Sequence, residues 1–185
     1  MTVATFEQIL GELRDVLSET DPQEEETFIR QLLAAERIFV CGLGRSGLMM
    51  RAFAMRLMHL GLTSFVVGET TTPSIQKGDL LAVGSGSGET STPVSMARLA
   101  KKTGATVAAI TGHRDSTLAQ LADMVIWIPA QSVMVAGTAT PASCQPLGTL
   151  AEQSLLVYLD SIVVRLWSTI GKTSEELSKR HANLE

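Results

Sequence analysis

IFVCGLGRSG, residues 38–47, places four apolar residues directly before a loop that contains glycine and serine. LLAVGSGSGET, residues 80–90, repeats this arrangement with a second loop of the same kind. A short continuous apolar run that ends at glycine is typical of a strand buried on both faces of a parallel sheet. Strands are therefore expected at Ile38–Cys41 and Leu80–Val83. Three further apolar runs predict similar strands: Ser64–Val67, Val107–Ile110 and Met124–Ile128.

Longer stretches with helical periodicity separate most of these runs. They lie at about 46–60, 90–103, 116–122 and 148–170. The second and third predicted strands are joined by a short turn at residues 73–76 instead. Strands that alternate with helices favour an α/β fold, in which helices flank a doubly wound, five-stranded parallel sheet. We expect the flavodoxin-like strand order 2-1-3-4-5.

Two more helices precede the first predicted strand and form an N-terminal extension over residues 5–36. Thr5 and Gln8 have the spacing of a capping box, and Asp21 followed by Pro22 signals the start of the second helix. A C-terminal helix and tail take up residues 148–185. Since no linker or repeat interrupts the chain, we expect a single domain over residues 1–185.

The composition excludes several classes of protein. Apolar residues make up 45% of the 185 residues, too many for a wholly disordered chain. The net charge of −4 argues against nucleic acid or an anionic membrane as partner, because both attract basic surfaces. Residues 124–151 carry no charge, but their prolines exclude a clean membrane-spanning helix. With two cysteines and no signal-peptide pattern, the protein is expected to be cytoplasmic.

The loops after the first and third predicted strands point to one ligand site. Ligands of open parallel sheets bind at the carboxyl ends of the strands where the winding reverses, here between these two strands. Each loop leads into a helix N-terminus, whose N–H groups and dipole favour an anion. For either loop alone, a simple turn with capping residues is an equal alternative. Together they predict a phosphate site at Arg45, Ser46, Ser85, Gly86, Ser87, Gly88, Glu89 and Thr90.

The first loop also satisfies the Gly-x-Gly-x-x-Gly pattern of dinucleotide-binding proteins. Residues 42–47 match it between a strand and a helix, and Glu69 follows the next strand, where it could contact a ribose. The second loop has no role in a dinucleotide site, however, and the chain has no room for a separate catalytic domain. Dinucleotide binding therefore stays as the weaker alternative.

Several segments together resemble one family. Residues 42–47, 53–61 and 66–70, the stretch 147–160 and the terminal residues 181–185 are similar to 6-phospho-3-hexuloisomerases. Residues 85–90 resemble the phosphate loop of the wider sugar-isomerase (SIS) domain. The resemblance covers nearly the whole chain. It departs at Ala151, where a bulky aromatic residue is expected, and this puts the packing behind Glu152 in question.

The resemblance implies a reaction and its surroundings. The implied reaction interconverts D-arabino-3-hexulose 6-phosphate and fructose 6-phosphate, with no metal and no cofactor. The implied pathway neighbour is a hexulose-phosphate synthase, which condenses formaldehyde with ribulose 5-phosphate. The implied assembly is a homo-oligomer, a tetramer or a dimer.

Glu152 is the first candidate for the catalytic group. Moving a carbonyl between C3 and C2 through a cis-enediol needs one group that removes a proton and returns it to the neighbouring carbon, and a carboxylate can do both. Glu152 opens a long helix as the first charge after the uncharged stretch. A glutamate in a first helical turn is more often a favourable partner of the helix dipole. The resemblance to the isomerase family favours a catalytic role for Glu152.

The three histidines are candidates for an assisting role. His59 lies near a predicted helix end and His113 in a loop after the fourth strand, where structural roles are common. The resemblance makes His181, in the C-terminal tail, the second catalytic candidate, with His59 behind it. The tail that carries His181 could close over the site of its own chain or be docked into a site by an oligomer. No spacing of His, Cys, Asp and Glu predicts a metal centre. A non-catalytic SIS module that senses a sugar phosphate remains the second functional hypothesis.

Overall fold

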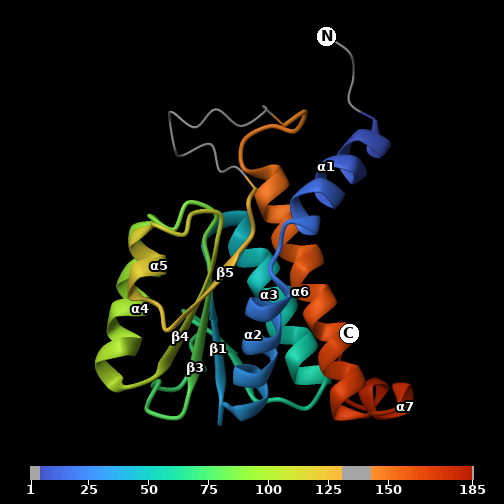
Figure 1. The fold of residues 1–185 in the computed structure, drawn as a ribbon. Coiled ribbons are helices and arrows are strands. Elements are labelled where there is room, and N and C mark those ends of the chain that lie inside the picture. Colours follow the sequence, from blue (N-terminus) through green and yellow to red (C-terminus); the bar gives the residue numbers. More distant parts are fainter. Residues whose placement is uncertain (1–4, 131–142, 185) are drawn as a thin grey trace.

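The computed structural model describes residues 5–130 and 143–184. Five parallel strands form one sheet in the order β2-β1-β3-β4-β5, which confirms the predicted order (Figure 1). The strands lie within two residues of the predicted positions: β1 Ile38–Cys41, β2 Ser64–Val66, β3 Leu80–Gly84, β4 Thr106–Thr111 and β5 Met124–Trp127. Seven helices connect and flank them: α1 Phe6–Ser18, α2 Pro22–Ala34, α3 Gly44–His59, α4 Ser91–Thr103, α5 Thr117–Leu121, α6 Thr149–Ile170 and α7 Ser174–Ser178, among the described residues.

The sheet is buried on both faces because successive strand residues point to opposite sides. Ile38 and Val40 of β1 belong to a core shared with α2, α3 and α6. Phe39 and Cys41 point to the other face, where α4 and α5 cover the sheet. The molecule therefore has three layers, with the sheet between two layers of helices (Figure 1). In the described residues, no helix is both long and apolar enough to cross a bilayer.

The N-terminal helices begin where the sequence predicts. Thr5 caps α1 through a capping box with Gln8, and Asp21 caps α2, with Pro22 as its first residue. Helix α3 begins at Gly44, two residues earlier than predicted, because glycine takes the positive φ of 55° that the turn into the helix requires. Ser46 thus lies inside the first turn of α3 rather than at its start.

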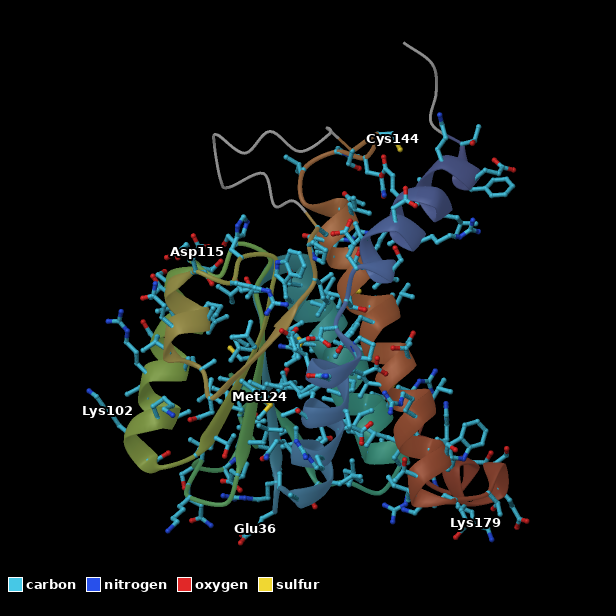
Figure 2. The ribbon with its side chains drawn as sticks, in the orientation of Figure 1. Glu36, Lys102, Asp115, Met124, Cys144 and Lys179 are labelled. Carbon is cyan, nitrogen blue, oxygen red and sulfur yellow. The ribbon has the colours of Figure 1, made fainter. Side chains whose placement is uncertain are left out.

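A buried ion pair joins β1 to β3 at their amino ends. The Arg37 guanidinium donates to the Asp79 carboxylate through Nε at 2.9 Å and Nη2 at 2.6 Å. The Asp79 side chain is fully buried and also accepts from the Gln76 amide at 2.8 Å. This end of the sheet, near Glu36, lies opposite the end near Asp115 and Cys144 (Figure 2). The pair therefore stabilises the sheet far from the loops that follow the strands.

Asp79→Ala is expected to lower the free energy of unfolding by about 3 kcal/mol, because it leaves a partly buried cation without its partner. The loss stays at the low end of the usual range since Arg37 is 23% exposed and can reach water. Urea denaturation measures it. Lys179→Ala, which removes an exposed pair with Glu175, is the control and should cost less than about 1 kcal/mol. Equal effects of the two substitutions would contradict this role of Asp79.

Candidate active site

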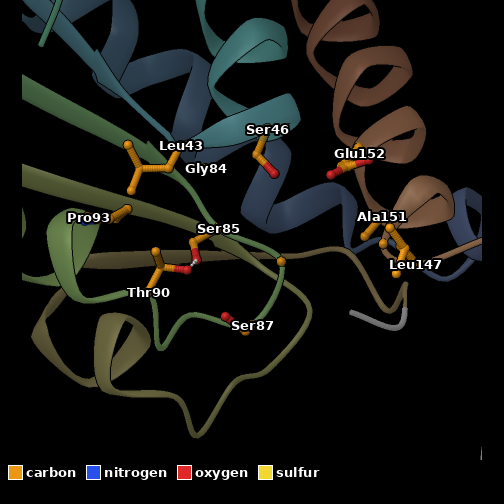
Figure 3. A pocket seen from close by; sticks show the side chains of 12 residues that line it. Leu43, Ser46, Gly84, Ser85, Ser87, Thr90, Pro93, Leu147, Ala151 and Glu152 are labelled. Atoms are coloured by element: carbon orange, nitrogen blue, oxygen red, sulfur yellow. Dashed lines mark hydrogen bonds between the residues drawn. The ribbon is translucent and has the colours of Figure 1, made fainter. Parts of the chain in front are cut away.

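A pocket of about 330 Å³ lies at the carboxyl ends of β1 and β3. Three segments wall it: the loop that opens α3, the loop between β3 and α4, and the first turn of α6 (Figure 3). Its lining residues are Leu43, Ser46, Gly84, Ser85, Gly86, Ser87, Thr90, Pro93, Leu147, Gly148, Ala151 and Glu152. The pocket thus lies where the strand order predicts a ligand site.

The first loop brings the start of α3 close to the end of β1. A side chain at Gly47 would place its Cβ 2.7 Å from the carbonyl oxygen of Gly42, so the two backbones can approach this closely only at glycine. The N-cap of α3 is Leu43, whose side chain cannot accept a hydrogen bond. The first-turn N–H groups are therefore available to an anion, beside the Ser46 hydroxyl.

The second loop holds two buried serine hydroxyls against the start of α4. Ser85 Oγ accepts from the Gly88 amide at 3.2 Å and lies 3.3 Å from Thr90 Oγ1. Ser87 Oγ accepts from the Glu89 amide at 3.2 Å. Ser85 donates its own hydrogen to Thr90, whereas Ser87 only accepts, so the Ser87 hydroxyl hydrogen can be donated to a ligand. The two loops together present hydroxyls and two helix N-termini to one pocket, an arrangement suited to a phosphate group.

Three residues predicted for the phosphate site, Arg45, Gly88 and Glu89, lie outside the pocket lining. Gly88 has a φ of 66°, and a side chain there would meet Ser116 Oγ at 2.1 Å. The Glu89 carboxylate accepts from the Thr117 amide and hydroxyl, both at 2.7 Å. These two bonds lower the pKa of Glu89. In this structure Gly88 and Glu89 tie the loop to the start of α5 instead of facing the pocket.

Glu152 and Arg45 approach each other at the mouth of the pocket. Glu152 lines the pocket from the first turn of α6, and its Oε2 lies 3.3 Å from Arg45 Nη1. Arg45 itself is absent from the lining and reaches toward the pocket from α3. The Glu152 side chain is 23% exposed, so its carboxylate is accessible to a small ligand but shielded from bulk water. One carboxylate thus faces two hydroxyl-rich loops across a small pocket.

Comparison with known proteins agrees with this geometry. A family model described as the SIS domain matches residues 31–149. The chain belongs to the SIS domain family. The matched region contains both loops, and Glu152 lies just beyond its end.

Relatives of this SIS protein extend over nearly its full length. The 3-hexulose-6-phosphate isomerase of Mycobacterium gastri is 48% identical over 177 residues, which are 96% of this chain and 88% of that protein. The enzyme of the same name from Bacillus subtilis is 39% identical over 178 residues, 96% of each chain. The crystal structure of MJ1247 from Methanococcus jannaschii, which infers a function as 3-hexulose-6-phosphate isomerase, has a TM-score of 0.82 and 34% identity, covering 97% of this chain and 96% of that one.

His59 and His181 of this SIS protein lie away from the pocket. His59 and His181 stack on each other, with ring centroids 5.4 Å apart, next to Arg56 and Trp167. Burial lowers the pKa of His59, and the nearby Arg56 and His181 add to this effect. Helix α6, with 22 residues, is roughly 33 Å long and separates this pair from Glu152 at its other end. Within one chain, Glu152 and His181 are therefore not brought together.

Some features of the SIS pocket have no signal in the sequence. Leu147 lines the pocket with a positive φ of 56° and a side chain that is 78% exposed. Ala151 borders both the pocket and a smaller adjoining cavity of about 20 Å³, so its small side chain leaves space behind Ser46. In the described part of the chain, no three His, Cys, Asp or Glu residues cluster closely enough to hold a metal ion.

Proposed function

We propose that this protein is a 3-hexulose-6-phosphate isomerase, which interconverts D-arabino-3-hexulose 6-phosphate and fructose 6-phosphate. One observation carries the proposal: a single accessible carboxylate, Glu152, faces the two hydroxyl-rich loops across a pocket of about 330 Å³. The relatives of this name, similar over almost the whole chain, support the same reaction.

The phosphate of the substrate binds to the two loops. Ser46, Ser87 and Thr90 supply hydroxyl donors, and the starts of α3 and α4 supply N–H groups. Ser85 lines the same pocket and orients Thr90 by donating to its Oγ1 at 3.3 Å. Binding the phosphate at this fixed point places the sugar carbons toward the first turn of α6. The pocket is therefore selective for phosphorylated sugars, because the unphosphorylated sugar leaves these donors without a charged acceptor.

The reaction itself is a proton transfer between neighbouring carbons. The Glu152 carboxylate removes the proton from C2, and the electron pair of that bond forms the C2–C3 double bond of a cis-enediol as the C3 carbonyl oxygen gains a proton from water. The protonated Glu152 then returns a proton to C3, while the C2 hydroxyl loses its proton to water and becomes the new carbonyl. Arg45, which lies 3.3 Å from Glu152, is placed to stabilise negative charge on the enediol oxygens.

His181 acts in a site of a second copy of the chain, in a homo-oligomer. Exposed apolar side chains on α1 and α6 support such an assembly: Phe6 is 71% exposed, Leu10 56%, and Val164 62%. The length of α6 supports a role for His181 in the pocket of a neighbouring copy, because it keeps His181 away from the pocket of its own chain. We place this assembly in the cytoplasm. In the reaction sequence it acts after a hexulose-phosphate synthase, which makes its substrate from formaldehyde and ribulose 5-phosphate.

Mixing two inactive variants tests the role of His181. Glu152→Gln and His181→Ala are each expected to lower turnover by at least about 100-fold. Random reassembly of equal amounts then creates sites with both native residues, and about a quarter of the wild-type activity returns. Light scattering on the wild-type protein should show a dimer or tetramer. A monomer, or a mixture without recovered activity, would contradict a site shared between copies.

A coupled enzyme assay tests the proposed activity. A hexulose-phosphate synthase generates the 3-hexulose phosphate in the cuvette, and product fructose 6-phosphate is detected through glucose-6-phosphate isomerase and glucose-6-phosphate dehydrogenase. Addition of this protein, in EDTA, should start NADPH formation at a rate proportional to its concentration. A sugar-phosphate sensor would bind fructose 6-phosphate without producing this signal.

A further inference from the structure

A carboxylate on α1 holds the segment that leads into the pocket. Glu12 lies near the middle of α1, which packs against α6. Its Oε2 accepts from Ser143 Oγ at 2.6 Å and from Gln145 Nε2 at 3.2 Å, and its Oε1 accepts from the Cys144 amide at 2.7 Å. Figure 2 shows Cys144 beside α1, at the end of the molecule that carries the pocket. We call Glu12 and its three donors the Glu12 clamp.

The Glu12 clamp is a strong local contact because its acceptor is charged. Burial raises the pKa of Glu12, but the hydrogen bonds from Ser143, Cys144 and Gln145 outweigh it and bring the pKa down to about 2. Hydrogen bonds to an ionised group are about twice as strong as neutral ones. Since the folded-state pKa is depressed, the clamp's full contribution is present above the ordinary glutamate pKa and is lost only as the pH falls toward 2.

The residues that follow the clamp form one wall of the pocket. Gln145 is buried, and two residues later Leu147 lines the pocket in the left-handed backbone region, at a φ of 56°. A leucine in this region costs roughly 1–2 kcal/mol and persists only where its surroundings hold it. Thr149 fixes the far side of this turn, donating from Oγ1 to the Pro146 carbonyl at 2.6 Å. The Glu12 clamp fixes the near side.

The same turn sets the position of Glu152. Gly148 is the N-cap of α6, and its carbonyl accepts from the Glu152 amide at 3.0 Å. A shift of residues 145–148 therefore moves both the wall of the pocket and the first turn that carries the Glu152 carboxylate. The phosphate loops after β1 and β3 do not contact the Glu12 clamp through any of its three bonds.

We propose that Glu12 is a positioning residue of the active site: by holding Ser143–Gln145, it fixes the turn at Leu147 and Gly148 and thereby aims the Glu152 carboxylate into the pocket. Its kinetic consequence rests on the proposed isomerase function, whereas its structural consequence does not. The sequence offers no sign of the clamp, because its partners are more than 130 residues apart.

Glu12→Ala tests this role, with Asp15→Ala as the matched control. Asp15 is an exposed acidic residue on the same helix, so the control removes the same charge. We expect Glu12→Ala to lower kcat about 10- to 100-fold, since a small misplacement of a catalytic group costs this much. The KM should change less than about threefold because the phosphate loops are intact. Wild-type kinetics in folded Glu12→Ala would overturn the proposal.

Three further readouts separate positioning from a general loss of structure. The kcat is expressed per fructose 6-phosphate site counted by calorimetry, so that unfolded protein does not lower it. Ser143→Ala, which leaves α1 unchanged, should lower this kcat in the same direction, and its effect should not add to that of Glu12→Ala, because both remove one contact. Glu12→Gln, which keeps an acceptor oxygen, should restore part of the kcat. Additive effects, or no effect of Ser143→Ala, would overturn the proposal even if Glu12→Ala fails to fold.

Hydrogen exchange tests the clamp without any enzyme activity. Amides of residues 144–148 should exchange faster in Glu12→Ala than in Asp15→Ala, while those of the phosphate loop at residues 85–90 should not change. Unchanged exchange at 144–148 would overturn the clamp. If wild-type protein shows no turnover but the exchange rises as expected, the proposed function fails while the clamp stands, so the two failures are distinguishable.

Discussion

Glu152→Gln is expected to lower kcat by about 1,000-fold while fructose 6-phosphate still binds with nearly wild-type affinity. The amide keeps the shape of the carboxyl group but cannot remove a proton from C2. Binding is expected to survive because the loops proposed to hold the phosphate, after β1 and β3, lie on the other side of the pocket. The coupled enzyme assay gives kcat, and titration calorimetry gives the affinity for fructose 6-phosphate.

Glu69→Gln is the matched control for this variant. Glu69 pairs with Arg51 on the surface and lies outside the pocket lining. The same chemical change there should leave kcat within about twofold, as surface ion pairs contribute little. Near-normal turnover of Glu152→Gln would remove Glu152 from the mechanism. It would leave the pocket as a binding site only, which is the sensor hypothesis.

The double variant Ser46→Ala, Ser87→Ala is expected to weaken fructose 6-phosphate binding by at least about 100-fold. Each hydroxyl that donates to a charged group contributes about 1.5–3 kcal/mol, or roughly 10- to 100-fold in affinity. Both residues line the pocket, Ser46 from α3 and Ser87 from the second loop (Figure 3). Titration calorimetry on the two single variants and the double variant measures these losses.

Two comparisons make this test specific for the phosphate. Ser168→Ala, at an exposed position on α6, should leave the affinity unchanged. Inorganic phosphate, tested as a competitor, should lose affinity in the double variant as fructose 6-phosphate does. An unchanged affinity for both ligands would show that the two loops do not hold the phosphate.

NAD at millimolar concentration serves as the probe for the dinucleotide alternative. Binding of NAD to the first loop would favour the dinucleotide hypothesis.

The sheet and the position of the pocket could be predicted because their signals are local. Apolar runs such as Ile38–Cys41 carry the burial pattern of a central parallel strand in four consecutive residues. The loops that follow are read directly from their glycines and serines. Strand order then brings the two loops together, since the carboxyl ends of neighbouring parallel strands lie at one edge.

Features that depend on distant contacts could not be predicted. Gly88 and Glu89 share a motif with Ser87, yet they face α5 because Ser116 and Thr117 happen to lie there. The distance between His181 and Glu152 depends on the length of α6, 22 residues in the structure. The bonds of Glu12 to Ser143 and Cys144 connect segments with no pattern in common.

Carbon-13 NMR on the reaction itself tests the central claim most directly. A hexulose-phosphate synthase supplied with ribulose 5-phosphate and ¹³C-formaldehyde places the label at C1 of the 3-hexulose phosphate, next to the carbon that becomes the carbonyl. With this protein and EDTA present, the C1 signal of the 3-hexulose phosphate should be replaced by that of fructose 6-phosphate, and Glu152→Gln should leave it unchanged on the same timescale. A signal that stays at the 3-hexulose phosphate with wild-type protein, with and without added divalent metal, would contradict the isomerase function.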